Sequence, residues 1–217
     1  MIVKVCGLRD SENIRQVVGL GVDWIGMEFR QQSERNVMMI PTHAGIIPDR
    51  APKSAVAANG GPRRQVWRVG VFTDEMAQNI ITRAVNFRLN AIQLQGDEQP
   101  TIIRNLRRTL DPDLCPGVRF IKRICLTSAD DLQRCEHYAD CVDYFLFEAG
   151  DSAHWAWLDG YRGSIPFLLG GIGPGDASAL RAFNHPQWVG IDLDLPFESA
   201  PGVKDVEALA AFLQQLA

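Results

Sequence analysis

The feature that most constrains the fold is an alternation of short β-branched runs with amphipathic stretches along all 217 residues. This rhythm is typical of parallel strands that are joined by crossover helices. Several runs are almost continuously apolar, as expected of strands that are covered on both faces. The predicted strands are Ile2 to Cys6, Trp24 to Phe29, Val66 to Phe72, Ala91 to Gln95, Arg119 to Ile124, Tyr144 to Glu148, Phe167 to Gly170 and Val189 to Leu193.

Short polar residues precede the amphipathic stretches and predict where the helices begin. Asp10 and Ser11 stand before an apolar-periodic stretch that reaches Leu20 and is followed by Gly21. The other predicted starts are Thr73-Asp74-Glu75 for a helix towards Phe87, Asp97-Glu98 for one towards Leu110, Thr127-Ser128, and Lys204-Asp205 before the terminal helix.

Eight such units predict a single (β/α)₈ barrel domain over residues 1–217. A doubly wound open sheet is the alternative, but it rarely uses eight units of this regularity. Residues 48–64 interrupt the rhythm, because they are rich in Pro, Gly, Ala and Arg. We expect a mobile loop there, with its basic residues in solvent, and no domain boundary.

Charge and cysteine content narrow the classes of function. The formal net charge is −4, which gives no basic surface for nucleic acid or for an anionic membrane. No apolar stretch is long enough to span a bilayer. The 5 cysteines lack the spacing of metal ligands, so reduced thiols, a cytoplasmic location and no metal site are expected. Any phosphate site has to be built locally.

Four segments, in order and in spacing, carry a family resemblance. They are Lys4-Val5-Cys6-Gly7-Leu8-Arg9-Asp10, Val69-Gly70-Val71-Phe72, Gln93-Leu94-Gln95-Gly96-Asp97-Glu98 and Ala200-Pro201-Gly202-Val203-Lys204-Asp205. Together they resemble phosphoribosylanthranilate isomerases of tryptophan biosynthesis. The resemblance implies a (β/α)₈ barrel and a cofactor-independent Amadori rearrangement of a phosphosugar, N-(5-phosphoribosyl)anthranilate. It leaves open whether the protein is a monomer or a homodimer.

The resemblance also implies roles for individual residues. Cys6 matches the general base, and Glu148 stands where the family carries an aspartate as the general acid. Arg35 matches an arginine that holds the anthranilate carboxylate, and Asp192 matches an aspartate near the substrate amine. Gly170 and Gly171 match a phosphate-binding turn. A purely structural role remains the alternative for each of these residues.

Other positions depart from the family pattern. Gln95 stands where a histidine is usual and is still expected to contact substrate. Residues 149–154 lack the usual glycine-rich run, and Asp194-Leu195-Pro196 replaces residues whose backbone N–H groups hold phosphate. Proline has no N–H to donate. A second hypothesis is therefore a diverged barrel that binds a ligand or partner with reduced, altered or no catalysis.

Overall fold

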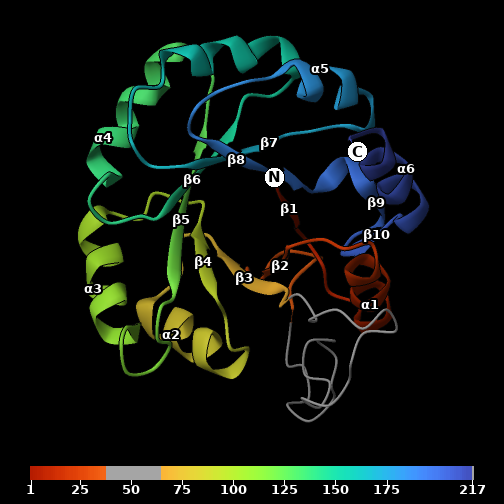
Figure 1. Ribbon diagram of the computed structural model, residues 1–217. Coiled ribbons are helices and arrows are strands. Elements are labelled where there is room, and N and C mark those ends of the chain that lie inside the picture. Colours follow the sequence, from red (N-terminus) through yellow and green to blue (C-terminus); the bar gives the residue numbers. More distant parts are fainter. Residues whose placement is uncertain (38–64, 217) are drawn as a thin grey trace.

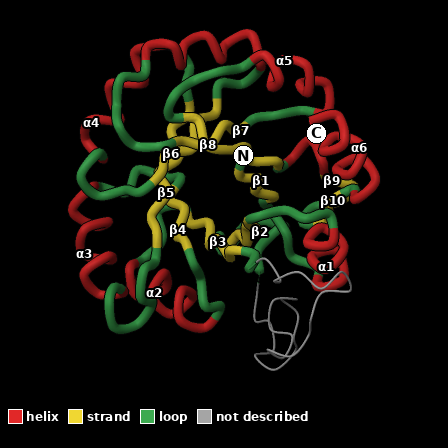
Figure 2. The backbone as a smooth tube through the Cα atoms, in the orientation of Figure 1, coloured by secondary structure: helices red, strands yellow, loops and turns green. Residues whose placement is uncertain are grey.

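A computed structural model describes residues 1–37 and 65–216, and its strands close into a barrel. Neighbouring strands are parallel and follow the sequence order from β1 to β8, with β8 paired to β1. Figure 2 shows the strands at the centre with the helices outside them. The strands are β1 (Ile2–Val5), β2 (Trp24–Glu28), β3 (Trp67–Phe72), β4 (Ala91–Leu94), β5 (Arg119–Cys125), β6 (Tyr144–Glu148), β7 (Phe167–Gly170) and β8 (Trp188–Leu193).

The closed barrel confirms the prediction and excludes the open sheet. The ends of each predicted strand lie within two residues of the ends of an observed strand. The agreement arises because β-branched runs buried on both faces are a strong local signal. Closure depends on one close approach between β8 and β1. An ideal Cβ on Gly190 would stand 2.3 Å from the Ile2 carbonyl oxygen, so a side chain at Gly190 would hold the two strands apart.

The crossovers form a ring around the barrel (Figure 1), and α1 and α6 lie side by side. The α-helices are α1 (Ser11–Gly19), α2 (Ala77–Asn86), α3 (Pro100–Leu110), α4 (Cys135–Tyr138), α5 (Ala177–Ala182) and α6 (Val206–Leu216). Short 3₁₀ segments are η2 (Ala129–Arg134), η3 (Ser152–Gly160), η4 (Pro174–Asp176) and η5 (Leu195–Phe197). A hairpin of β9 (Glu198–Ala200) and β10 (Val203–Lys204) precedes α6.

The predicted cap of α1 is confirmed, since the Asp10 side chain accepts a hydrogen bond from Asn13 N at 2.8 Å. The segment after Thr127-Ser128 is a 3₁₀ helix, and Asp131 accepts hydrogen bonds from the Thr127 and Ser128 backbone N–H groups. The predicted start of this helix is thus correct, but the helix is of the 3₁₀ type, which is wound more tightly than an α-helix.

Two predicted caps are wrong. The helix after Thr73-Asp74-Glu75 begins at Ala77, with Met76 as its N-cap, and the helix after Asp97 begins at Pro100, with Gln99 as its N-cap. The acidic residues tie neighbouring loops together instead. Asp74 accepts from Asp97 N at 2.6 Å, and Glu98 accepts from Asp74 N at 3.0 Å. Long-range hydrogen bonds therefore replaced the local caps that the sequence indicated.

The barrel interior is layered. Its lower layer is apolar and is formed by Trp24, Val69, Ala91, Ile121, Leu146 and Leu168. Trp24 stacks on Trp67 with ring centroids 5.0 Å apart. Above this layer lie buried polar side chains, including Lys4, Gln93 and Asp192. The polar layer supports the mouth at the carboxyl ends of the strands.

The prediction of a mobile loop at residues 48–64 lies outside the described residues. Within the described part, no helix combines the length and apolar character that a membrane crossing requires.

Candidate active site

A cavity of about 370 Å³ lies at the carboxyl end of the barrel, and its wall is formed by residues at the ends of the eight strands or in the segments that follow them. This is the end at which enzymes of this fold carry their active sites. The lining residues are Cys6, Gly7, Glu28, Arg30, Arg35, Val71, Gln95, Arg123, Glu148, Gly150, Gly171, Ile172, Asp194, Leu195 and Pro196. The cavity thus brings Cys6, Arg35, Gln95, Glu148 and Gly171 together, as predicted for a shared site.

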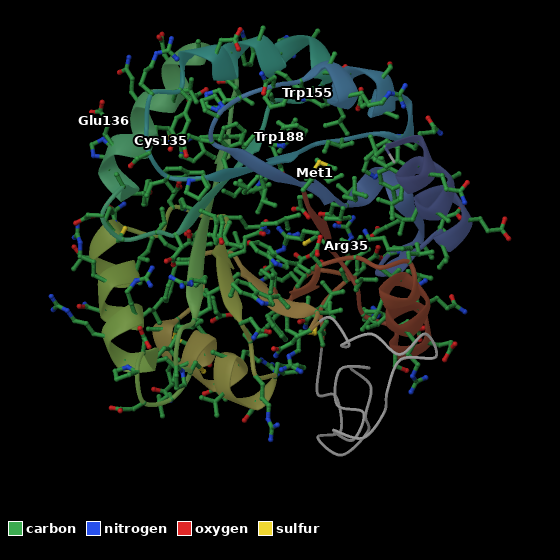
Figure 3. The ribbon with its side chains drawn as sticks, viewed as in Figure 1. Met1, Arg35, Cys135, Glu136, Trp155 and Trp188 are labelled. Carbon is green, nitrogen blue, oxygen red and sulfur yellow. The ribbon has the colours of Figure 1, made fainter. Side chains whose placement is uncertain are left out.

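A larger hollow of about 440 Å³ lies elsewhere, around η2, α4 and the loop after η3. Cys135 and Glu136, which line it, lie at the periphery of the barrel (Figure 3). Glu136 and Arg162 are the charged residues in its lining. Because the mouth instead gathers several acids and bases at the strand ends, we place the candidate site in the mouth.

Cys6 directly follows β1 and is buried, with 4% of its surface exposed. Its backbone N donates to the Leu193 carbonyl at 2.9 Å, which fixes the residue between β1 and β8. Space for the sulfur comes from Gly26 on β2, where an ideal Cβ would stand 2.6 Å from Cys6 Sγ. The thiol therefore occupies a fitted position in the cavity wall.

The electrostatic surroundings keep this thiol protonated. Burial raises the pKa of Cys6 to about 12, Lys4 opposes the shift, and Asp192 and Asp194 add to it. A thiol that acts as a base near neutral pH is expected to have a lowered pKa. That expectation is not met here, so any proton abstraction by Cys6 draws on a small thiolate fraction.

Asp192 lies in the buried floor and does not line the cavity, and neither does Gly170. Asp192 Oδ2 accepts a hydrogen bond from Lys4 Nζ at 2.8 Å, and both side chains are buried. Burial raises the pKa of Asp192 to about 6, against the attraction of Lys4. Asp192 Oδ1 has no hydrogen-bond partner among the described residues.

Glu148, the last residue of β6, is paired with Arg123 of β5. Arg123 Nε and Nη2 approach the same carboxylate oxygen, Oε2, at 2.8 and 2.5 Å. The carboxylate contributes to raising the pKa of Arg123, although burial acts in the opposite direction. Gly170 on β7 leaves room for this side chain, because an ideal Cβ there would stand 3.0 Å from Glu148 Cγ.

Arg35 belongs to a cluster of two cations and two carboxylates beside Gly7. Its Nη2 lies 2.9 Å from Glu198 Oε2, and its Nη1 lies 3.7 Å from Asp194 Oδ1. The buried Lys204 Nζ binds the same two acids at 3.0 and 3.1 Å. Arg35 is labelled in Figure 3 near β1 and β10. The cluster joins the loop after β2 to the segment that follows β8.

The rim next to β6, β7 and β8 combines glycines with apolar residues. Gly150 and Gly171 have φ values of +76° and +72°, a conformation that L side chains rarely adopt. Leu195 and Pro196 line the opposite part of the rim. Gln95 Nε2 donates to Thr73 Oγ1 at 3.1 Å at the end of β4. The glycines that allow a close approach of the backbone to a ligand therefore lie on the β6–β7 side of the cavity.

Sequence reasoning missed Arg123, Glu198 and Lys204. Arg123 reads as an ordinary strand residue, and its partner Glu148 lies 25 positions away in the chain. The sequence predicts no role in the site for Lys204, although its side chain is fully buried. The signal that points to Lys204 is its place inside the Ala200 to Asp205 segment that carries the resemblance.

Over residues 1–37 and 65–216, no group of three or more His, Cys, Asp or Glu side chains is arranged to hold a metal ion.

A closed parallel barrel with acids, bases and arginines in its carboxyl-end mouth defines a (β/α)₈-barrel enzyme. Comparison with known proteins narrows this class. The family model of N-(5'-phosphoribosyl)anthranilate isomerase matches residues 3–215, so the chain belongs to that family.

Relatives and solved structures agree. The N-(5'-phosphoribosyl)anthranilate isomerase of Phocaeicola vulgatus is 39% identical, and the alignment covers 100% of this chain and 98% of that protein. The N-(5'-phosphoribosyl)anthranilate isomerase of Parabacteroides distasonis is 35% identical, and the alignment covers 100% of this chain and 93% of that protein. A crystal structure of phosphoribosyl anthranilate isomerase in complex with reduced 1-(o-carboxyphenylamino)-1-deoxyribulose 5-phosphate superposes with a TM-score of 0.74. It is 25% identical and covers 100% of this chain and 98% of that one.

Proposed function

We propose that this chain catalyses the Amadori rearrangement of N-(5'-phosphoribosyl)anthranilate to 1-(2-carboxyphenylamino)-1-deoxyribulose 5-phosphate, a step of tryptophan biosynthesis. The observation that carries the proposal is the shared cavity of Cys6, Glu148 and Arg35 in a chain of this family. The reaction needs an acid, a base and anchors for two anions, and no cofactor. Each of these groups is available in the mouth.

In the first step, the protonated Glu148 carboxyl donates its proton to the furanose ring oxygen. The C1–O bond breaks, and the nitrogen lone pair forms a C1=N bond. Glu148 is then a carboxylate, and in the structure without ligand its partner is Arg123. The barrel mouth restricts the geometry of the sugar, which supplies part of the rate acceleration.

In the second step, the Cys6 thiolate removes the C2 proton. The electrons of the C–H bond form a C1=C2 enolamine, whose tautomerisation gives the ketone at C2 and the secondary amine at C1. Because burial raises the pKa of Cys6 to about 12, this proton transfer is the slower of the two steps. Lys4, which lies beneath Cys6, stabilises the thiolate electrostatically.

The remaining predicted residues bind the ligand in this proposal. Arg35 holds the anthranilate carboxylate, while the backbone at Gly170 and Gly171 faces the phosphate. Gln95 contacts the substrate from the end of β4, and Asp192 acts from the floor through its buried Oδ1 towards the substrate amine. A cytoplasmic location and a monomeric or homodimeric state remain predictions.

A diverged barrel that binds a ligand without this catalysis is the second candidate. Asp194, Leu195 and Pro196 favour it, because they line the cavity where a phosphate cradle is expected. Expression in a tryptophan auxotroph that lacks the isomerase separates the two candidates. Growth without tryptophan supports the isomerase, and no growth with well-expressed, folded protein supports the diverged barrel.

A further inference from the structure

Each arginine in the cavity wall is already bound by a carboxylate. Arg30 Nε lies 3.1 Å from Glu28 Oε1, Arg35 is held by Glu198, and Arg123 is held by Glu148. The lining contains three arginines and three acids, so it carries no net charge. An anionic ligand that takes up the full two-nitrogen fork of one of these arginines must therefore displace the carboxylate from it.

Glu198 and Glu148 differ in what surrounds them once a ligand has taken their arginine. Glu198 still has a cation beside it when a ligand binds Arg35, because Lys204 Nζ lies 3.0 Å from Glu198 Oε1. Glu148 has no second cation within ion-pair distance among the described residues. Its other neighbours are Cys125, whose Sγ lies 4.0 Å from Oε2, and the buried Asp192, on which Glu148 exerts a like-charge repulsion. Without Arg123, Glu148 is a carboxylate among groups that disfavour its charge.

The location of Arg123 suits a phosphate group. Its guanidinium is 28% exposed and enters the cavity next to the β6–β7 side, where Gly150 and Gly171 also form the wall. Both arginine nitrogens that bind Glu148 converge on one oxygen, so Nη1 remains available to a second acceptor. Arginine forks match phosphate oxygens in geometry as well as in charge.

We propose that Arg123 exchanges its bond with Glu148 for a bond with the ligand's phosphate, and that Glu148 takes up a proton from solvent in response. The inference deepens the proposed function and rests on it. Phosphate binding then supplies the protonated acid that the ring-opening step needs. The ion pair that occupies the acid in the absence of ligand is thereby converted into a switch that loads Glu148 with a proton.

Binding of sulfate tests the exchange without requiring turnover. Sulfate is a dianion that does not titrate near neutral pH, so any proton taken up belongs to the protein. Isothermal titration in two amine buffers of different ionisation enthalpy, between pH 6 and pH 8, measures that uptake. We expect uptake of up to one proton per sulfate bound, increasing towards pH 6.

Variants assign the uptake to the two residues. Arg123→Gln should weaken sulfate binding by about tenfold or more, which is the loss of a charge-assisted hydrogen bond. Glu148→Gln should still bind sulfate but take up no proton. Arg104→Gln is the matched control, because Arg104 on α3 also forms a two-nitrogen ion pair with a carboxylate, that of the exposed Asp140. It should leave both affinity and proton uptake unchanged.

Absence of sulfate binding, binding by the wild type without proton uptake, or uptake that persists in Glu148→Gln would overturn the inference. The wild-type measurement alone decides it if either variant fails to fold. The proposed isomerase activity and the proposed exchange can be refuted independently of each other. An active enzyme without proton uptake overturns only the exchange, and proton uptake in a protein that does not isomerise overturns only the proposed function.

Discussion

The sulfur of Cys6 lies where a side chain on Gly26 would otherwise stand, since an ideal Cβ at Gly26 would be 2.6 Å from Sγ and 3.1 Å from the Cys6 Cα. The contact joins β1 to β2 at the level of the candidate base. The absence of a side chain at Gly26 therefore leaves the room that the thiol occupies, and this glycine of β2 has a direct steric role in the site.

Gly26→Ala should displace Cys6 and reduce both stability and activity. Overpacking costs about 1–3 kcal/mol, and a misplacement of about 1 Å reduces the rate roughly 10²-fold. Urea unfolding and steady-state kinetics measure the two effects. Gly19→Ala is the control, because nothing lies within 4 Å of its Cβ position on α1. Equal activity of Gly26→Ala and wild type would show that the fitted position of the sulfur has no role.

The pH dependence of turnover follows from the raised pKa of Cys6, about 12. Thiols lose their proton as pH rises, so well below this pKa the thiolate fraction increases about tenfold per pH unit. We expect kcat to increase between pH 7 and pH 9, with a primary isotope effect on substrate deuterated at C2. A kcat that is constant over this range, without an isotope effect, would contradict proton abstraction by Cys6 as the slow step.

The buried pair of Lys122 and Glu98 should be far more important for stability than a surface pair. Lys122 Nζ lies 2.8 Å from Glu98 Oε2, and both side chains are almost completely buried. Lys122→Met leaves the Glu98 charge without its cation, which costs about 3–5 kcal/mol. Arg104→Met, in the exposed pair with Asp140, should cost less than about 1 kcal/mol. Urea unfolding measures both, and similar losses would contradict the distinction.

Arg35→Met should weaken substrate binding while leaving the chemistry of the bound substrate largely intact. Hydrogen bonds to charged groups contribute about 1.5–3 kcal/mol, so KM should increase roughly 10- to 100-fold. Glu198 retains Lys204 as a partner, so the cluster should survive the substitution. Arg15→Met, which removes an exposed arginine of α1, is the control. A fall in kcat with unchanged KM would contradict carboxylate binding by Arg35.

The strands could be predicted from the sequence because buried parallel strands leave a local apolar signal. Cys6 and Arg35, which the family resemblance singles out, line one cavity, since all strand ends of a parallel barrel meet at one mouth. The predicted helix starts at Asp74 and Glu98 were wrong, because both carboxylates accept hydrogen bonds from backbone N–H groups of other loops. A short polar residue before a helix does not reveal whether its acceptor is used locally or across the barrel.

The ion pairs of the mouth could not be predicted. Arg123 and Glu148 meet only through the register of β5 with β6, in which Cys125 pairs with Glu148. Lys204 reaches Asp194 and Glu198 because the β9–β10 hairpin folds back beside Gly7. Such pairings depend on strand register and hairpin geometry, which composition and spacing do not encode.

The most direct test of the central claim is the isomerisation of freshly generated N-(5'-phosphoribosyl)anthranilate by the purified protein and by Cys6→Ser. The wild type should form the carboxyphenylamino deoxyribulose phosphate product. Loss of the general base in the folded variant should reduce kcat/KM by about 10²- to 10⁴-fold. No product from the folded wild-type protein, or equal rates for both proteins, would contradict the account.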